Sequence, residues 1–278
     1  MILSEKSATF RDHALDGGSP LDAEAKGRPE QRHIQSIEIG FRLIRVLADA
    51  GSKLPLKTLS ARAEMPPGKA HLYLVSFMRI GLVVQDPATM HYGLGPYALQ
   101  LGVAALQQIS LPDLARAPLA RLNTQFELPA YLSLWGRMGP FIAVKLDADL
   151  PTPFTIKVGF VFPLLSTATG NIFLAHMPTR ETEPLVVREG RLDPELLARR
   201  DAIIAQVRME GIAISKGHLF RGFSAIAAPI FDHTGALAGS VTLLGLGSQI
   251  DRSPAGPVAA QVRQAARDLS QQLGSPHR

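Results

Sequence analysis

The side chains that could carry out catalysis or bind a metal are scattered through this sequence, and their spacing excludes most reactive sites. There are no cysteines, which excludes disulfides, thiolate metal ligands and a cysteine nucleophile. No two of the eight histidines lie four residues apart on a helix beside a carboxylate cluster, so nothing supports a zinc centre. We therefore expect no metal site and no cofactor.

Two glycine-containing segments come near to catalytic or cofactor motifs without completing them. Gly222-Phe-Ser224 has the first glycine of a nucleophile elbow but lacks the second. Gly93 and Gly95 precede a helix but lack the third glycine of a dinucleotide-binding loop. These gaps predict that the protein is not an enzyme, with a small-molecule hydrolase kept as the less favoured alternative.

A hydroxyl-rich segment gives the best candidate for a ligand site. Ser166 and Thr167 follow an apolar stretch and are both placed to cap a helix that begins near Ala168. Free backbone N–H groups of residues 168–170, which are Ala168, Thr169 and Gly170, would then attract an anion. On the residues alone an ordinary capped helix is the favoured interpretation, and a small organic acid bound at this helix end is the alternative.

Neighbouring strands are expected to supply the walls of that site. Tyr131 and Trp135 share one face of a predicted strand, and Thr242 and Leu244 share one face of another. The predicted pocket therefore has both aromatic and hydroxyl side chains.

The first ordered part of the chain has the element order of a DNA-binding fold. Apolar spacing predicts a helix with Ser36 as its N-cap and with this inward-facing set: Ile34, Ile37, Phe41, Ile44 and Ala48. A shorter helix follows, and Pro67 is placed to open a third one that ends at Gly81. Strands over 82–86 and 91–94 complete a winged helix-turn-helix over 33–94.

In a helix-turn-helix the second helix of the pair lies in the major groove with its N-terminal residues toward the bases. The outward positions of the third helix include Gly68, Lys69, His71, Leu72 and Ser76. Lys69 and His71 can donate to bases or phosphates. Lys53 and Lys57 flank the preceding helix and are expected to contact the DNA backbone.

The flanking segments differ in character. Residues 1–32 mix basic and acidic side chains around Gly17-Gly18-Ser19-Pro20 and predict a disordered tail, either inert or acting as an arm on DNA. The apolar pattern over 95–110 predicts a linker helix that packs on its copy in a homodimer, with a dimer of dimers as an alternative.

The remainder, 111–274, alternates helices and strands. Turn signals and apolar spacing predict three helices after the first one of this region, near 168–177, 193–210 and 258–273. Strands are expected at 130–136, 140–147, 154–158, 212–215, 223–231 and 236–245. The tight turn at Asp232–Gly235 implies antiparallel pairing and hence an α+β domain.

The chain has 278 residues and a net charge of +5, from 29 basic and 24 acidic side chains. This balance permits a nucleic-acid partner without requiring one. No apolar run is long enough to cross a bilayer and the N-terminus lacks the apolar core of a secretory signal, so we expect a cytoplasmic protein with no membrane partner.

The ordered series of motifs resembles the IclR family of bacterial transcription regulators over about 33–273. It includes Asp86-Pro87 with Tyr92-x-Leu94-Gly95-Pro96, the loop 163–170, and Asp232-x-x-Gly235. The resemblance implies that the first domain binds an operator. It also implies that the second is a GAF-like antiparallel α/β domain that binds a small-molecule effector and helps to assemble dimers or tetramers.

The sequence departs from the family pattern at several positions. Leu72 stands where a basic residue is common, and His91, which we place at the DNA, stands with Gly93 where the wing usually has arginines. Ala225 replaces a common cysteine and Leu244 a serine, and the acids usual near Ser215 are absent. These losses favour an apolar or aromatic organic acid as effector.

The sequence therefore predicts a regulator that binds double-stranded DNA at a palindromic operator with an affinity that a small-molecule effector changes. Two other readings stay open. One alternative is a ligand-binding adaptor that no longer binds DNA. The other is a winged helix that contacts another protein instead of DNA.

Overall fold

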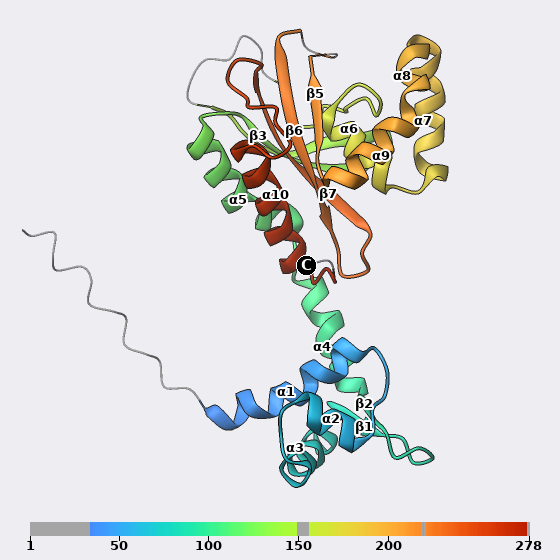
Figure 1. Cartoon of the computed structure of the whole chain (residues 1–278), viewed down its shortest axis with the longest axis vertical. Coiled ribbons are helices and arrows are strands. Elements are labelled where there is room, and N and C mark those ends of the chain that lie inside the picture. Colours follow the sequence, from blue (N-terminus) through green and yellow to red (C-terminus); the bar gives the residue numbers. More distant parts are fainter. Residues whose placement is uncertain (1–33, 149–155, 218, 220, 277–278) are drawn as a thin grey trace, which may run out of the picture. The chain divides into compact units, whose positions relative to one another are not determined.

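The computed structural model describes residues 34–148, 156–217, 219 and 221–276. The tail predicted over 1–32 lies outside these residues. The chain divides into two compact units between Val103 and Ala104, and Figure 1 labels helices and strands of both.

The first unit has the predicted order of three helices and a hairpin. Its elements are α1 (Gln35–Ala50), α2 (Leu56–Arg62), α3 (Pro67–Arg79), β1 (Val83–Gln85) and β2 (Tyr92–Leu94). Gly51 ends α1 in the left-handed conformation, and Pro67 opens α3 as expected. Leu43, Leu59 and Leu74, one from each helix, are fully buried at the centre of the unit.

The buried face of α1 is not the one that the apolar spacing predicted. Gly40, Leu43 and Leu47 face the core, whereas Ile34 and Ile37 are 65% and 56% exposed. Gly40 is required because a Cβ there would lie 2.9 Å from the ring of Tyr73. The predicted N-cap was also wrong, because the helix begins at Gln35 and places Ser36 inside its first turn.

A single helix, α4 (Pro96–Gln107), follows β2 and contains the division between the units. It has no buried residue and no acidic or basic side chain at either end. Its exposed apolar side chains include Tyr97, Leu99, Leu101, Val103 and Leu106. The predicted linker helix is thus present, and its apolar surface is uncovered in one copy of the chain.

The second unit is built on an antiparallel sheet of order β4-β3-β7-β6-β5. The strands are β3 (Ala130–Gly136), β4 (Gly139–Leu146), β5 (Ala213–Lys216), β6 (Phe223–Phe231) and β7 (Leu237–Leu246). The first helix, α5 (Leu111–Phe126), and the last, α10 (Pro257–Gln272), cover one face of this sheet. The other face is covered by α6 (Ala168–His176), which packs against α9 (Arg200–Glu210), as Figure 1 shows. The predicted α+β class with an antiparallel sheet is confirmed.

Three predictions of secondary structure in this unit were wrong. The helix α7 (Thr179–Leu192) was missed, since Pro184 and many charged residues obscure its apolar spacing. The helix expected over 193–210 is two helices, α8 (Pro194–Ala198) and α9, which meet at Arg199. Residues 156–158 form no strand, and the β-bridge in this region joins Phe141 to Val161. Residues 154 and 155 lie outside the described part.

Candidate functional site

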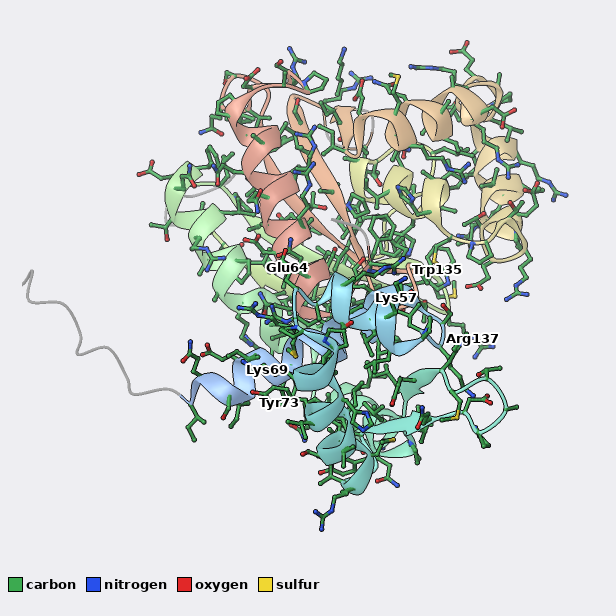
Figure 2. The ribbon with its side chains drawn as sticks, turned by 60° about the horizontal axis from the view of Figure 1, so that its bottom comes forward. Lys57, Glu64, Lys69, Tyr73, Trp135 and Arg137 are labelled. Atoms are coloured by element: carbon green, nitrogen blue, oxygen red, sulfur yellow. The ribbon has the colours of Figure 1, made fainter. Side chains whose placement is uncertain are left out.

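The outward surface of α3 is the one that the sequence predicted. Gly68, Lys69, His71, Leu72 and Ser76 are all exposed, and the inward Ala70 and Leu74 are fully buried. Lys57 on α2 and Lys69 on α3 are labelled in Figure 2, and neither forms an ion pair with a described residue. The first turns of α3 therefore present a cation, an imidazole and an apolar side chain together.

Two of these side chains also make contacts within the unit. The Nδ1 atom of His71 lies 3.5 Å from the hydroxyl of Tyr92 in the wing. The hydroxyl of Ser76 donates to the carbonyl of Leu72 one turn earlier. His91 is half-buried, and its carbonyl accepts from the Asp86 amide across the base of the wing.

Lys53, which we expect at the DNA backbone, forms an ion pair within the first unit. Its Nζ atom lies 2.7 Å from Oδ2 of Asp86 at the start of the wing turn. The hydrogen bond from Lys53, with those from the Thr89 and Ala88 amides, lowers the pKa of Asp86 from 3.8 to about 2. Gly93 makes room for this pair, because a Cβ there would lie 2.8 Å from Cγ of Lys53. The glycine in the wing thus accommodates a lysine that comes from another part of the chain.

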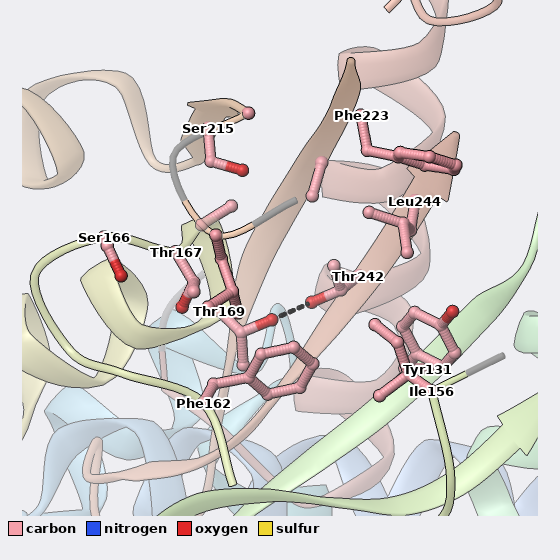
Figure 3. A pocket seen from close by; sticks show the side chains of 14 residues that line it. Tyr131, Ile156, Phe162, Ser166, Thr167, Thr169, Ser215, Phe223, Thr242 and Leu244 are labelled. Atoms are coloured by element: carbon pink, nitrogen blue, oxygen red, sulfur yellow. Dashed lines mark hydrogen bonds between the residues drawn. The ribbon is translucent and has the colours of Figure 1, made fainter. Parts of the chain in front are cut away.

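A narrow cavity of about 30 Å³ lies between the sheet and the start of α6. Eight of the ten predicted effector residues line it: Tyr131, Ser166, Thr167, Ala168, Thr169, Ala225, Thr242 and Leu244. Figure 3 shows the hydroxyls of Thr169 and Thr242 meeting across it, 2.9 Å apart. No charged side chain is among the lining residues of the described chain.

The cap of α6 settles which hydroxyl holds the helix end. Oγ1 of Thr167 accepts from the Gly170 amide at 2.9 Å and donates to the Pro163 carbonyl at 2.7 Å. The amide of Gly170 is therefore not free, contrary to the prediction. The amides of Ala168 and Thr169 have no acceptor within the described chain.

The loop before α6 is held from both sides. The Glu189 carboxylate on α7 accepts from the amides of Leu164 and Leu165, each at 2.9 Å. The Asn171 side-chain amide donates to the carbonyls of the same two residues. A Cβ on Gly170 would overlap the Pro163 carbonyl, so only glycine allows this close approach of loop and helix.

Trp135 and Gly170 are the two predicted effector residues that do not line the cavity. Trp135 does share a sheet face with Tyr131, but its ring stacks on Phe173 of α6 with centroids 5.8 Å apart. It belongs to a separate apolar cluster with Leu164 and Leu165. The sheet face of Trp135 was predicted correctly, but Trp135 lies too far along β3 from Tyr131 to reach the cavity.

Several lining residues were not anticipated: Ile156, Phe162, Ser215, Gly217, Leu219 and Phe223. Most are apolar and lie at strand ends or in loops, where the sequence pattern does not separate a pocket wall from an ordinary core position. Burial raises the pKa of the Tyr131 hydroxyl, and the nearby Asp147 carboxylate raises it further. The phenol is therefore neutral and able to donate.

The described residues contain no group of three or more His, Asp or Glu side chains that could hold a metal ion. None of the described helices has the length and apolar character needed to span a membrane.

Comparison with known proteins identifies both units. Residues 103–271 match the model of the bacterial transcriptional regulator IclR C-terminal domain, and residues 36–87 match the IclR helix-turn-helix domain. The chain is 28% identical to the glycerol operon regulatory protein of Streptomyces griseus over 250 residues, which cover 88% of this chain and 98% of that protein.

Two further relatives agree. The Pca regulon regulatory protein of Pseudomonas putida is 28% identical over 86% of this chain and 84% of its own length. The crystal structure of Pseudomonas aeruginosa HmgR superimposes with a TM-score of 0.81 at 32% identity, and the match covers 88% of this chain and all of that one. The chain belongs to the IclR family of transcriptional regulators, with a helix-turn-helix DNA-binding domain and a C-terminal effector-binding domain.

Proposed function

We propose that two copies of this chain bind a palindromic operator through α3 and the wing, and that a small apolar or aromatic organic acid changes the operator affinity. The observation that carries the effector part is the uncharged cavity closed at one end by the α6 N-terminus. Its two amides without an acceptor, on Ala168 and Thr169, are the natural partners of a carboxylate.

The apolar walls support the choice of ligand. Ile156, Phe162, Phe223 and Leu244 surround the cavity, so a ligand there loses its water shell over most of its surface. An anion needs a positive partner in such surroundings, and the helix end supplies one. The Thr169 and Thr242 hydroxyls are placed to accept or donate one further hydrogen bond.

The DNA-binding part uses the predicted set of contacts. Lys69, His71 and Leu72 face the major groove, and Gly68 brings its amide to a phosphate. Lys57, Ser76 and His91 contact the backbone or groove edges. Lys53 contacts phosphate from the wing while paired with Asp86.

The apolar surface of α4 supports the homodimer, with a dimer of dimers as an alternative. The helix has no buried residue and exposes five large apolar side chains to water. Such an exposed apolar surface is typical of a protein–protein contact, and here a second copy of the chain would cover it. Ile34, directly before α1, and Ile37 and Phe41 on α1 are further exposed apolar side chains of the first unit. The proposed parts are the DNA-binding domain 33–94, the linker 95–110 and the effector domain 111–274, with the tail 1–32 as an inert extension or, alternatively, an arm on DNA.

We assign no catalytic activity to the chain. The effector regulates DNA binding by thermodynamic linkage. If the effector binds one arrangement of the dimer more tightly than another, the free energy of operator binding changes by that difference in effector binding, typically about 1–3 kcal/mol.

Fluorescence anisotropy and footprinting on the DNA upstream of the gene test the proposal. The wild type should protect a twofold-symmetric site with an affinity that falls steeply with salt. Lys69→Ala should weaken binding by about 1–3 kcal/mol, and Lys157→Ala, which removes an exposed lysine of the second unit, should have no effect. Equal effects of the two variants, or no protected palindrome at low salt, would exclude this mode of DNA binding.

A further inference from the structure

A nearly buried lysine lies on the effector side of the sheet, outside the cavity lining. Lys145 on β4 pairs with Tyr131 on β3 in the antiparallel register, and Tyr131 lines the cavity. Residues directly opposite each other in such a pair point to the same face, with Cβ atoms about 4.5–5.5 Å apart. The Lys145 side chain is only 8% exposed, so it is largely shielded from solvent on the same face of the sheet as Tyr131.

One carboxylate neutralises this ammonium. The Nζ atom of Lys145 lies 2.6 Å from Oδ1 of Asp147. The two partners differ in burial, because the Asp147 side chain is 61% exposed. The backbone of Asp147 is held by the Asn123 side-chain amide, which donates to its carbonyl at 3.0 Å. The carboxylate can therefore turn toward water while its backbone stays in place.

The ion pair lies at one particular end of the cavity. The Asp147 carboxylate is close enough to the Tyr131 hydroxyl to act on it electrostatically. In Figure 3, Tyr131 and Ile156 occupy the end of the pocket away from Ser166 and Thr167. The cavity thus has the start of α6 near one end and Tyr131, the strand partner of Lys145, near the other, with the Thr169–Thr242 hydroxyl pair between them.

A buried ammonium without a counter-charge destabilises the fold strongly. Asp147 supplies that counter-charge. Its carboxylate is largely exposed, so breaking the ion pair costs little free energy for Asp147, because water then solvates the carboxylate. An anionic group of a ligand could replace it and would gain a partner that is already desolvated, whereas an exposed lysine would first have to lose its water.

We infer that Lys145 binds a second acidic group of the effector, with Asp147 as the resident counter-ion that the ligand displaces. The effector class is then a diacid with an apolar middle, one carboxylate on the α6 amides and the other on Lys145. This inference rests on the proposed function, since it extends the same pocket.

The test compares matched monoacids and diacids, such as phenylacetate with 4-carboxyphenylacetate and benzoate with terephthalate, by isothermal titration calorimetry on the full-length protein. The wild type should prefer a diacid over its monoacid by about tenfold or more, the range of a hydrogen bond to a charged group. Lys145→Met should bring the ratio close to one. Asp147→Asn should raise it about threefold or more, because the lysine loses its internal competitor.

The two variants are expected to change the diacid-to-monoacid affinity ratio in opposite directions, and this separates ligand binding from a structural role. An ion pair that only holds β4 in place would make both variants lower the melting temperature and weaken both probes together, which overturns the inference. Lys145→Gln provides a second, polar replacement if Lys145→Met folds poorly. Operator binding without ligand should stay within about twofold in every variant.

Two further outcomes distinguish this inference from the proposed function. If both members of each pair bind with the same ratio in all variants, the inference fails and the acid-binding pocket stands. If no probe binds the wild type at millimolar concentration, both the inference and the proposed class of effector fail.

Discussion

Oγ1 of Thr169 lies 2.9 Å from Oγ1 of Thr242, and this contact joins the first turn of α6 to the central strand β7. Both side chains are almost completely buried, at 1% and 2% exposure. Each hydroxyl therefore has the other as its hydrogen-bond partner across the cavity.

The Thr169–Thr242 pair should show strong non-additivity. Thr169→Val and Thr242→Val should each lower the free energy of unfolding by about 1–3 kcal/mol, because each leaves one buried hydroxyl unpaired. The double variant should be less destabilised than the sum of the two, since both polar groups are then gone. Urea denaturation of the four proteins measures the coupling, and additive losses would show that the hydroxyls find other partners.

The Lys53–Asp86 pair should make stability depend on pH in the acid range. The folded-state pKa of Asp86, about 2, lies below its ordinary value of 3.8, so the ionised carboxylate favours the folded wing. This contribution is complete above about pH 4 and is lost as the pH falls toward 2.

Asp86→Asn is the matched variant, because its side-chain oxygen can still accept from the Ala88 and Thr89 amides. The melting temperature of the wild type should exceed that of the variant at neutral pH, and the gap should close between about pH 4 and pH 2. A gap that is constant over this range would mean that the charge of Asp86 does not stabilise the wing.

Trp135 should not contribute to effector affinity, in contrast to the prediction from its sheet face. Trp135→Phe keeps an aromatic ring against Phe173 and should change the affinity for an acid probe by less than about twofold. Phe223→Ala removes a wall of the cavity and should weaken the same probe about tenfold, in the range for loss of a buried aromatic contact. Calorimetry is the suitable readout, since Trp135 is the only tryptophan. Similar losses in the two variants would place Trp135 in the ligand's path.

The sequence predicted correctly those helix ends and turns that depend on residues close together in the chain. Pro67 at the start of α3 and Gly51 after α1 are strong signals in any context. The apolar run of β6 and the turn at Asp232, whose carboxylate accepts from the Thr234 and Ala236 amides, are equally local. These features were enough to predict the α+β class and antiparallel pairing, but the order of the strands in the sheet was not predicted.

The errors arise where distant parts of the chain decide the outcome. Ile34, Ile37 and Phe41 have helical spacing, but Gly40 allows Tyr73 to approach the other face of α1. Lys53 looks like any lysine before a helix until the wing brings Asp86 to it. Lys145 shows no signal in the sequence, because only strand pairing places it beside Tyr131.

The small size of the effector cavity has a consequence for the apparent affinity of the effector. A space of about 30 Å³ holds a water molecule or two and no aromatic acid, so the chain must visit a wider conformation before a ligand can enter. The apparent dissociation constant is then the intrinsic one divided by the fraction of open molecules. Substitutions that widen the resting state would sensitise the protein to the same metabolite without touching a single contact to it.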